Sequence, residues 1–225
     1  MGEYAVQVER LEKRYRDREA LKDVSFRLEA GTVTALLGPE GAGKTTLIRI
    51  LAGMAFPDGG TVSLFGSSDA AGLRAARQQT GFLADAAFGK RSFNVEKNLI
   101  LLAGLYGKPD RRYIRKLMRR LHIAEQDVGR KRIGTLPEVV QARYALAAAL
   151  AHKPRLLILD EPLEELHTDD LETVYSLLRE LREEGTTMLL SGRSPARLRH
   201  VCSQALLLEG GVLTGPVPMD ALGEE

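Results

Sequence analysis

Strand-like and helix-like hydrophobic patterns alternate along this chain. Val24, Phe26 and Leu28 alternate with polar residues, as in a half-buried strand, whereas residues 47–52 have helical spacing that ends at Gly53. The same criteria predict a helix over residues 168–184 and further strands at residues 32–37, 61–65, 80–83, 156–160, 187–191 and 205–208. Residues 156–159 and 188–190 are continuously apolar, as in strands buried on both faces of a parallel sheet. The alternation predicts an α/β fold, with a mostly parallel sheet flanked by helices.

Residues 94–151 interrupt this alternation, because they contain three helical patterns and no strand pattern. They predict a helical lobe inserted into a single domain that spans residues 1–225. The middle of the lobe is basic, with cations at helical spacing: Lys108, Arg111, Arg112, Arg115, Lys116, Arg119 and Arg120. Two interpretations stay open for this helix. Its basic face is either simply solvated or in contact with an acidic partner or anionic lipid.

The composition is that of an ordinary globular protein. The chain has 225 residues, a formal net charge of +2, 44% hydrophobic residues and 28% charged residues. These values exclude a disordered chain. The chain has a single cysteine, Cys202, which excludes a disulfide scaffold and indicates a reducing compartment. We expect Cys202 to be a small apolar residue of the core. The charge balance gives no reason to expect a nucleic-acid partner. With no leader pattern and no long apolar run, we expect a cytoplasmic protein.

The sequence Gly38-Pro39-Glu40-Gly41-Ala42-Gly43-Lys44-Thr45 is a complete phosphate-binding loop between a predicted strand and a predicted helix. The glycines allow successive backbone N–H groups to turn toward a phosphate, and the helix directs its unsatisfied donors at the same anion. Lys44 is expected to reach the β- and γ-phosphates, and the Thr45 hydroxyl to ligate Mg²⁺. A chance glycine-rich turn is the alternative.

A second acidic motif follows a buried strand, in Leu156-Leu157-Ile158-Leu159-Asp160-Glu161-Pro162. Both carboxylates are therefore expected at the C-terminal edge of a sheet, beside the phosphate-binding loop. Asp160 is predicted to complete the Mg²⁺ shell, and Glu161 to polarise an attacking water as the catalytic carboxylate with Lys44. The structural alternative is an acidic turn after a core strand.

With both motifs in this order, the chain resembles the ATP-binding subunits of ABC transporters over nearly its whole length. The resemblance implies a P-loop NTPase fold of ABC type with an N-terminal antiparallel β part. It implies Mg²⁺ and ATP as ligands, a transmembrane permease and a second ATP-binding subunit as partners, and a peripheral location at the inner face of the cell membrane. It also places Tyr15 against adenine. The implied nucleotide contacts are Tyr15, Gly38, Pro39, Glu40, Gly41, Ala42, Gly43, Lys44, Thr45, Thr46 and Arg193.

The family's signature motif, Leu-Ser-Gly-Gly-Gln, is replaced here by residues 136–140, Leu-Pro-Glu-Val-Val. In the family this helix start binds the γ-phosphate held by the other subunit. Pro137 lacks an N–H, and Thr135 with Glu138 forms a capping-box pattern that predicts a self-capped helix start. A carboxylate about 5 Å from a phosphate charge costs on the order of 3 kcal/mol at an effective dielectric near 20. The sequence therefore predicts a helix start that repels anions.

Three further family positions also depart from the pattern. The glutamine that ligates Mg²⁺ falls at Asp85, whose carboxylate is also able to coordinate the metal. His167 stands where the family has an aspartate that crosses to the other subunit. The switch histidine is replaced by Arg193, which carries a fixed positive charge suited to a γ-phosphate but accepts no hydrogen bond. The register of Asp85 and Arg193 is open by about one residue.

The groups that act within one subunit are thus retained, and those that act on the other subunit's nucleotide are lost. We expect a subunit that binds ATP and hydrolyses it weakly or only beside a partner. A nucleotide-gated module without turnover is the alternative. A soluble ABC-type protein of translation or DNA repair is disfavoured, since tandem domains, a zinc insertion and long coiled coils are not found in the sequence.

Overall fold

The computed structural model describes residues 4–83, 90, 92–123, 131–164 and 166–223. The chain opens with an antiparallel hairpin, β1 (Tyr4–Tyr15) and β2 (Arg18–Glu29), and β4 (Gly59–Leu64) pairs with the other edge of β1. These strands form a three-stranded sheet in the order β2-β1-β4. This sheet is the N-terminal antiparallel β part that the resemblance implied.

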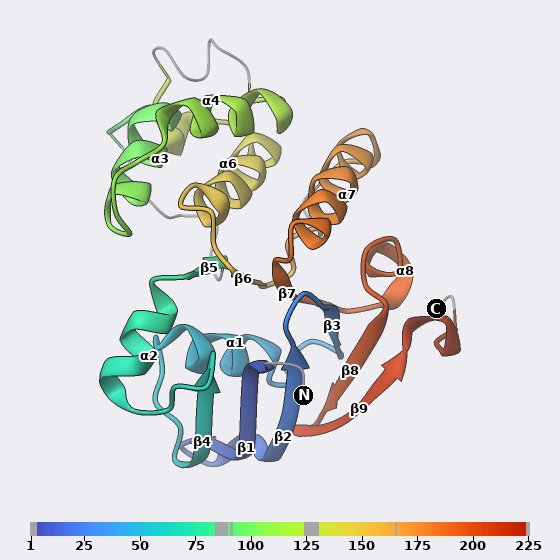
Figure 1. Ribbon diagram of the computed structural model, residues 1–225. Coiled ribbons are helices and arrows are strands. Elements are labelled where there is room, and N and C mark those ends of the chain that lie inside the picture. Colours follow the sequence, from blue (N-terminus) through green and yellow to red (C-terminus); the bar gives the residue numbers. More distant parts are fainter. Residues whose placement is uncertain (1–3, 84–89, 91, 124–130, 165, 224–225) are drawn as a thin grey trace.

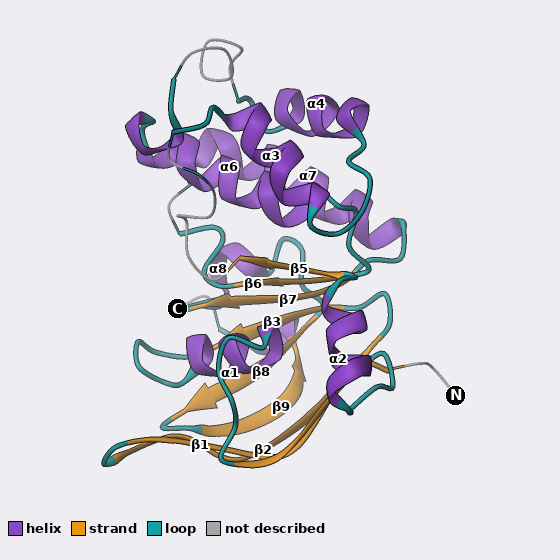
Figure 2. Ribbon diagram, turned by 90° about the vertical axis from the view of Figure 1, so that its left-hand side faces the viewer, coloured by secondary structure: helices purple, strands orange, loops and turns teal. Residues whose placement is uncertain are grey.

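A six-stranded sheet forms the middle layer of the molecule, in the order β5-β6-β7-β3-β8-β9 (Figure 2). Its strands are β3 (Val33–Leu37), β5 (Thr80–Leu83), β6 (Leu156–Leu159), β7 (Thr187–Gly192), β8 (Gln204–Glu209) and β9 (Val212–Pro218). All neighbours are parallel except β8 and β9, which form a hairpin. The C-terminal ends of β3, β5, β6 and β7 consequently meet at one edge of the sheet.

Helices cover both faces of this sheet. They are α1 (Lys44–Ala52), α2 (Ala70–Arg77), α3 (Val95–Gly104), α4 (Arg111–Arg120), α6 (Glu138–Leu150), α7 (Thr168–Glu183) and α8 (Pro195–Leu198), with 3₁₀ turns at Ile133–Thr135 and Met219–Ala221. Helix α1 lies between the two sheets, whereas α3, α4 and α6 form the predicted helical lobe on the opposite side (Figures 1 and 2).

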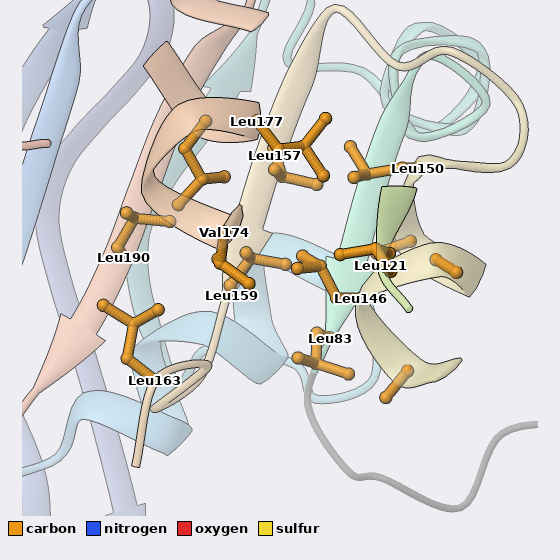
Figure 3. Close-up of a cluster of buried hydrophobic side chains, with 14 of the residues drawn as sticks. Leu83, Leu121, Leu146, Leu150, Leu157, Leu159, Leu163, Val174, Leu177 and Leu190 are labelled. Atoms are coloured by element: carbon orange, nitrogen blue, oxygen red, sulfur yellow. The ribbon is translucent and has the colours of Figure 1, made fainter. Parts of the chain in front are cut away.

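Two hydrophobic clusters join these layers, one on each face of the parallel sheet. In β6, Leu157 and Leu159 belong to the cluster shared with the helical lobe and α7, whereas Leu156 and Ile158 belong to the cluster shared with α1 and the antiparallel sheet. Figure 3 shows Leu157 and Leu159 among side chains of α6 and α7. The continuously apolar strands are therefore buried on both faces, as their sequence predicted.

The predicted segments agree with the structure within one or two residues at each end, with two exceptions. The strand predicted at residues 24–28 begins at Arg18 in β2, and the helix predicted at residues 47–52 begins at Lys44 in α1. The sequence patterns did not identify β1, α2, α8, β9 or the two 3₁₀ turns. In β1 the register shifts at several points against β2, which interrupts the alternation expected of a regular strand. Among the residues that the structure describes, no helix is both long and apolar enough to cross a membrane.

Candidate functional site

The loop between β3 and α1 forms a backbone cradle that only glycine fits at its key positions. Gly41 has φ +76° and Gly43 has φ +113°, both in the left-handed region that L side chains rarely adopt. A Cβ at Gly43 would lie 2.4 Å from the carbonyl oxygen of Ala20. The glycines therefore set the path of the loop, and the unsatisfied first-turn N–H groups of α1 follow directly.

Neighbouring elements hold this loop in place. The N–H of Gly38 donates to the carbonyl of Gly192 at the end of β7, at 3.3 Å, and the N–H of Gly211 donates to the carbonyl of Ala42, at 3.2 Å. The guanidinium of Arg18, at the start of β2, donates to the carbonyl of Gly41. The loop is thus fixed by three contacts from distant segments, which preorganises its amides for an anion.

Lys44 projects from the first turn of α1 into the cradle. Only 4% of the residue is exposed. Its Nζ donates to the carbonyl of Gly38 at 2.7 Å and to that of Pro39 at 3.1 Å, and lies 3.4 Å from Oε1 of Glu161. A buried ammonium needs an anion or several acceptors, and here it has both. It is therefore a cation fixed within the loop.

Asp160, directly after β6, accepts hydrogen bonds from two hydroxyls, one in the first turn of α1 and one near the end of β7. Thr45 Oγ1 donates to Asp160 Oδ2 at 2.7 Å, and Ser191 Oγ donates to Asp160 Oδ1 at 2.5 Å. The same Ser191 Oγ accepts the N–H of Glu161 at 2.9 Å. Hydroxyl and carboxylate oxygens are the ligands that Mg²⁺ prefers. The donor set beside the phosphate-binding loop therefore fits this ion, with Thr45 and Asp160 as its holders.

Glu161 occupies a strained backbone position, with φ +46°. Its carboxylate lies between two cations: Oε1 faces Lys44 Nζ at 3.4 Å, and Oε2 lies 3.5 Å from Nε of Arg193. Arg193 follows β7 and also lies 3.7 Å from Oε2 of Glu40, on the phosphate-binding loop. The acid and both cations thus surround the space next to the loop.

These groups line a cleft of about 600 Å³. Tyr15, 46% exposed, stands at its rim, where Nζ of Lys13 lies 5.2 Å from the centre of the ring. The other predicted site residues in its wall are Glu40, Gly41, Ala42, Gly43, Lys44, Thr45, Thr46, Asp160, Glu161 and Arg193. A cleft of this size, lined by an aromatic ring, cations and the phosphate-binding loop, suits a nucleoside phosphate.

The comparison with known families matches residues 21–164 to the model of the ABC transporter family. The chain belongs to this family. Its match includes the phosphate-binding loop, the helical lobe and the Asp160–Glu161 motif, which confirms the resemblance found in the sequence.

Individual relatives agree with the family assignment. The ABC-family chain is 34% identical over 216 residues, 94% of its length, to Nod factor export ATP-binding protein I of Neorhizobium galegae, and it spans 61% of that relative. An ATP-binding subunit of an ABC transporter superposes with a TM-score of 0.87 at 25% identity, over 96% of this chain and 91% of the other. A dimeric ATP-binding cassette, solved in a post-hydrolysis state with ADP and phosphate, shares the fold with a TM-score of 0.86 at 22% identity, over 95% and 98% of the chains.

Two of the positions that depart from the family pattern, Asp85 and His167, are not found in the cleft that the structure describes. Asp85, the predicted third metal ligand, lies outside the described residues. His167 is the residue that precedes the first turn of α7; it is exposed and makes no side-chain hydrogen bond to that turn.

The single cysteine of this ABC-family chain, Cys202, is buried at 5% exposure, as expected of an apolar core residue.

The predicted capping box at the signature position is wrong. The structure describes all of residues 131–150, and there α6 begins at Glu138 with Pro137 as its capping residue and no side-chain cap. Thr135 lies in the preceding 3₁₀ turn, where its hydroxyl donates to the carbonyl of Arg132 at 2.8 Å. With Pro137 as the capping residue, Thr135 lies two positions before it and does not cap the helix. Glu138 nevertheless remains an acid in the first turn.

Sequence reasoning missed two functional residues. Ser191 is the bridge between Asp160 and Glu161, and Arg18 contacts the phosphate-binding loop. A hydroxyl at the C-terminal end of a buried strand was a usable signal for Ser191, because that edge carries the acidic motif. No local pattern marks Arg18, whose position depends on how the first hairpin packs.

Proposed function

We propose that the protein is the ATP-binding subunit of an ABC transporter that binds Mg-ATP in this cleft. The observation that carries the proposal is the direct contact of Thr45 with Asp160 beside the glycine cradle. It joins a phosphate-binding loop to a carboxylate suited to Mg²⁺. When bound, the ion would supply a positive charge between the phosphates and these two side chains.

Each cleft residue has a defined part in this proposal. Lys44 and the loop amides would bind the β- and γ-phosphates, and Tyr15 would stack on the adenine. Glu161 would accept a hydrogen bond from the attacking water and orient it, while Arg193 adds positive charge near the terminal phosphate. Lys44 and Thr45 lie in the first turn of α1, and the remaining groups follow strands of the parallel sheet: Asp160 and Glu161 after β6, and Arg193 after β7. The sheet therefore fixes their spacing.

The proposed membrane partner is a transmembrane permease, and this chain has a candidate surface on which it could dock. A groove of about 320 Å³ lies between α2, α3 and α6, with Phe82 and Leu102 in its wall. Three apolar side chains at this groove are unusually exposed: Met54 at 51%, Leu105 at 70% and Tyr106 at 41%. Exposed apolar patches of this kind mark protein interaction sites.

The second subunit is proposed to be a chain with an intact signature motif. Pro137 and Glu138 leave the start of α6 with one missing donor and one negative charge, so this chain would serve a partner's nucleotide poorly. Replacing Pro137 with Ser and Glu138 with Gly is expected to increase ATP-dependent dimerisation, measured by light scattering. An unchanged mass with ATP would contradict this part of the proposal.

A second function, nucleotide gating without turnover, is favoured by one observation: both oxygens of Glu161 face cations. Phosphate release from the purified chain, alone and with its permease, separates the two. Turnover that Glu161→Gln abolishes supports hydrolysis. Tight Mg-ATP binding without release supports gating. Glu164→Gln, at an exposed carboxylate three residues on in the same cleft, is the matched control and should leave turnover unchanged.

A further inference from the structure

Helix α4 carries cations along its whole exposed side. Six of its ten residues are arginine or lysine, and the helix contains no acid. Ile114, Leu117 and Met118 form its opposite side and are buried in the helical lobe. The helix lies on the outer side of that lobe, away from both sheets (Figures 1 and 2). We use the term basic face for the exposed cations of this segment: Lys108, Arg111, Arg112, Arg115, Lys116 and Arg119.

The arrangement of these charges does not help α4 to fold. Arg111 and Arg112 occupy the first turn, where the helix macrodipole disfavours cations. Like charges four residues apart on a helix repel one another, and α4 has such pairs at 111–115, 112–116, 115–119 and 116–120. The helix is stabilised instead by its buried apolar side and by Asp110, whose carboxylate accepts the N–H of Tyr113 at 2.9 Å. Folding therefore does not account for the basic face.

Only part of this charge is neutralised by other segments of the chain. Arg115 Nε lies 2.7 Å from Oε1 of Glu96 on α3, and Arg120 pairs with Glu180 on α7. The other cations of this segment make no ion pair with any residue that the structure describes: Lys108, Arg111, Arg112, Lys116 and Arg119. The basic face is thus complementary to an anionic surface outside the chain.

The first turn of α4 lies beside the groove proposed for the permease. Tyr106 lines that groove and stacks on His152. Lys153, the next residue, pairs with Asp110 at 2.8 Å, and its Nζ lies 4.7 Å from the centre of the Tyr113 ring. The groove and the start of the basic face are therefore continuous. A permease docked in the groove would bring the first turn of α4 close to the lipid that surrounds that permease.

We propose that the basic face binds the anionic lipid head groups of the membrane that holds the permease. The inference goes beyond the proposed function and rests on it only for location, since the permease brings this chain to a bilayer. Anionic membrane surfaces attract clustered Lys and Arg side chains, with a gain in affinity of about fivefold per cation. The apolar side of α4 is packed in the lobe and is not available to insert among acyl chains. The contact is therefore electrostatic.

A lipid surface fits this side of α4 better than an acidic protein does. Every exposed position of the helix holds a cation, with no exposed aromatic or apolar side chain between them. Protein interfaces depend on aromatic and apolar anchors that become buried at their centre, and this side of α4 offers none. A layer of anionic head groups presents charge without fixed positions, so it needs no such anchors.

The test is flotation of the purified full chain with vesicles, without permease or nucleotide. The wild type should bind phosphatidylcholine vesicles that contain about one-third phosphatidylglycerol, and should not bind vesicles of phosphatidylcholine alone. Arg111→Gln, Arg112→Gln and Arg119→Gln together should weaken this binding about a hundredfold, because three cations worth about fivefold each are removed. Raising the salt concentration from about 0.1 M to about 0.5 M should release the wild type.

The matched control removes the same charge from the opposite end of the molecule. Arg10, Arg16 and Lys22 are also exposed, on the β1–β2 hairpin far from α4 (Figure 1). Replacing these three with Gln lowers the net charge equally but should change vesicle binding by less than about threefold, because screening limits the reach of distant charges. Thermal unfolding detects a structural role: the α4 variant should have a Tm equal to or above that of the wild type, since repelling cations are removed.

Two results would overturn the inference: equal binding of the wild type to anionic and neutral vesicles, or equal losses in the two triple variants. It is also wrong if the α4 variant keeps its affinity for anionic vesicles but no longer co-purifies with the permease in neutral detergent, since the basic face would then contact protein.

Calorimetry with Mg-ATP on the same proteins separates this inference from the proposed function. Binding of Mg-ATP without a preference for anionic vesicles would leave the proposed function standing and remove the role of the basic face. Binding to anionic vesicles that the α4 variant loses, in a chain that does not bind Mg-ATP, would have the opposite meaning.

Discussion

The Thr45 hydroxyl donates a 2.7 Å hydrogen bond to Oδ2 of Asp160, although 115 residues separate the two in sequence. The sheet order brings them together, because β7 alone lies between β3 and β6 and all three strands run in the same direction. The phosphate-binding loop and the acidic motif thus leave the sheet at one edge. A metal ion bound between Thr45 and Asp160 would therefore connect the phosphate-binding loop with the acidic motif.

Ser191 is predicted to hold the acidic motif in its working geometry. Its hydroxyl is buried and bonds to both Asp160 Oδ1 and the N–H of Glu161. Ser191→Ala should reduce the free energy of unfolding by about 1–3 kcal/mol, since the part-buried Asp160 carboxylate and the N–H of Glu161 each lose a hydrogen-bond partner. It should also weaken the Mg²⁺ dependence of nucleotide binding. Urea unfolding and calorimetry at several Mg²⁺ concentrations measure the two effects.

Ser194 offers the matched control for this substitution. It is exposed, lies three residues later and makes no side-chain hydrogen bond to the first turn of α8. Ser194→Ala should change stability by less than about 0.5 kcal/mol, as expected for a surface site. Equal behaviour of the two alanine variants would show that the Ser191 bridge is unimportant.

Gly43→Ala is predicted to abolish nucleotide binding. A Cβ there would lie 2.4 Å from the carbonyl oxygen of Ala20, at a residue with φ +113°. The loop would have to move, and its amides would no longer converge on a phosphate. Gly31→Ala is the control that has the backbone strain without the steric clash. Gly31 also has a positive φ, +77°, but no atom lies within 4 Å of the position that its Cβ would take. That control should lose only about 1 kcal/mol of stability and bind nucleotide normally.

The sequence was sufficient for the parts of the fold that depend on local pattern. Continuously apolar strands, the helix after the phosphate-binding loop and the three helices of the lobe each have a periodicity that is independent of tertiary contacts. The position of Asp160 beside Thr45 was also predictable, because the C-terminal ends of parallel strands share an edge. Those parts of the cleft were therefore expected before the structure.

The remainder depends on contacts that no local pattern carries. Arg18 reaches Gly41 only because the first hairpin folds over the loop, and β1 departs from regular alternation through its register shifts. At α6 the capping-box pattern was outweighed by Pro137, whose fixed φ decides where the helix begins. Sequence patterns of this kind compete, and packing selects the one that is formed.

His152 should make stability pH-dependent between about pH 7.5 and 5.5. Its ring stacks on Tyr106 with centroids 3.8 Å apart, and Nε2 lies 3.3 Å from the carbonyl oxygen of Thr80. Burial lowers the pKa of His152 below its usual 6.5. The unfolded chain therefore takes up a proton first as pH falls, so protonation favours unfolding and the stability is lost below about 6.5. The contact with the Thr80 carbonyl acts in the opposite direction and raises the pKa of His152, but burial has the larger effect.

His152→Phe tests this assignment, because it retains a stacking ring that does not titrate. The variant should lose less stability than the wild type between pH 7.5 and 5.5, measured by urea unfolding. Carboxylates whose pKa is lowered by hydrogen bonds, such as Asp110 beside Lys153, lose their contribution only below about pH 4. Identical pH profiles for the two proteins would rule out His152 as the titrating group.

Cys202 should be inert while the chain is folded. Burial raises the pKa of its thiol to about 12. At pH 8 a disulfide reagent should therefore react about a thousandfold more slowly with the folded protein than with the urea-unfolded chain, because the thiolate is the nucleophile. Rapid modification of the native protein would show that the segment around Cys202 opens readily.

Calorimetric titration with Mg-ATP tests the central claim most directly, using the wild type, Lys44→Ala and Lys153→Ala. Lys44 is buried in the loop, whereas Lys153 is an exposed lysine paired with Asp110, so the two substitutions remove the same charge at different places. The account predicts saturable binding of about one nucleotide per chain for the wild type and Lys153→Ala, and a loss of about a hundredfold or more in affinity for Lys44→Ala. No heat of binding in the wild type, or equal affinity in all three proteins, would contradict it.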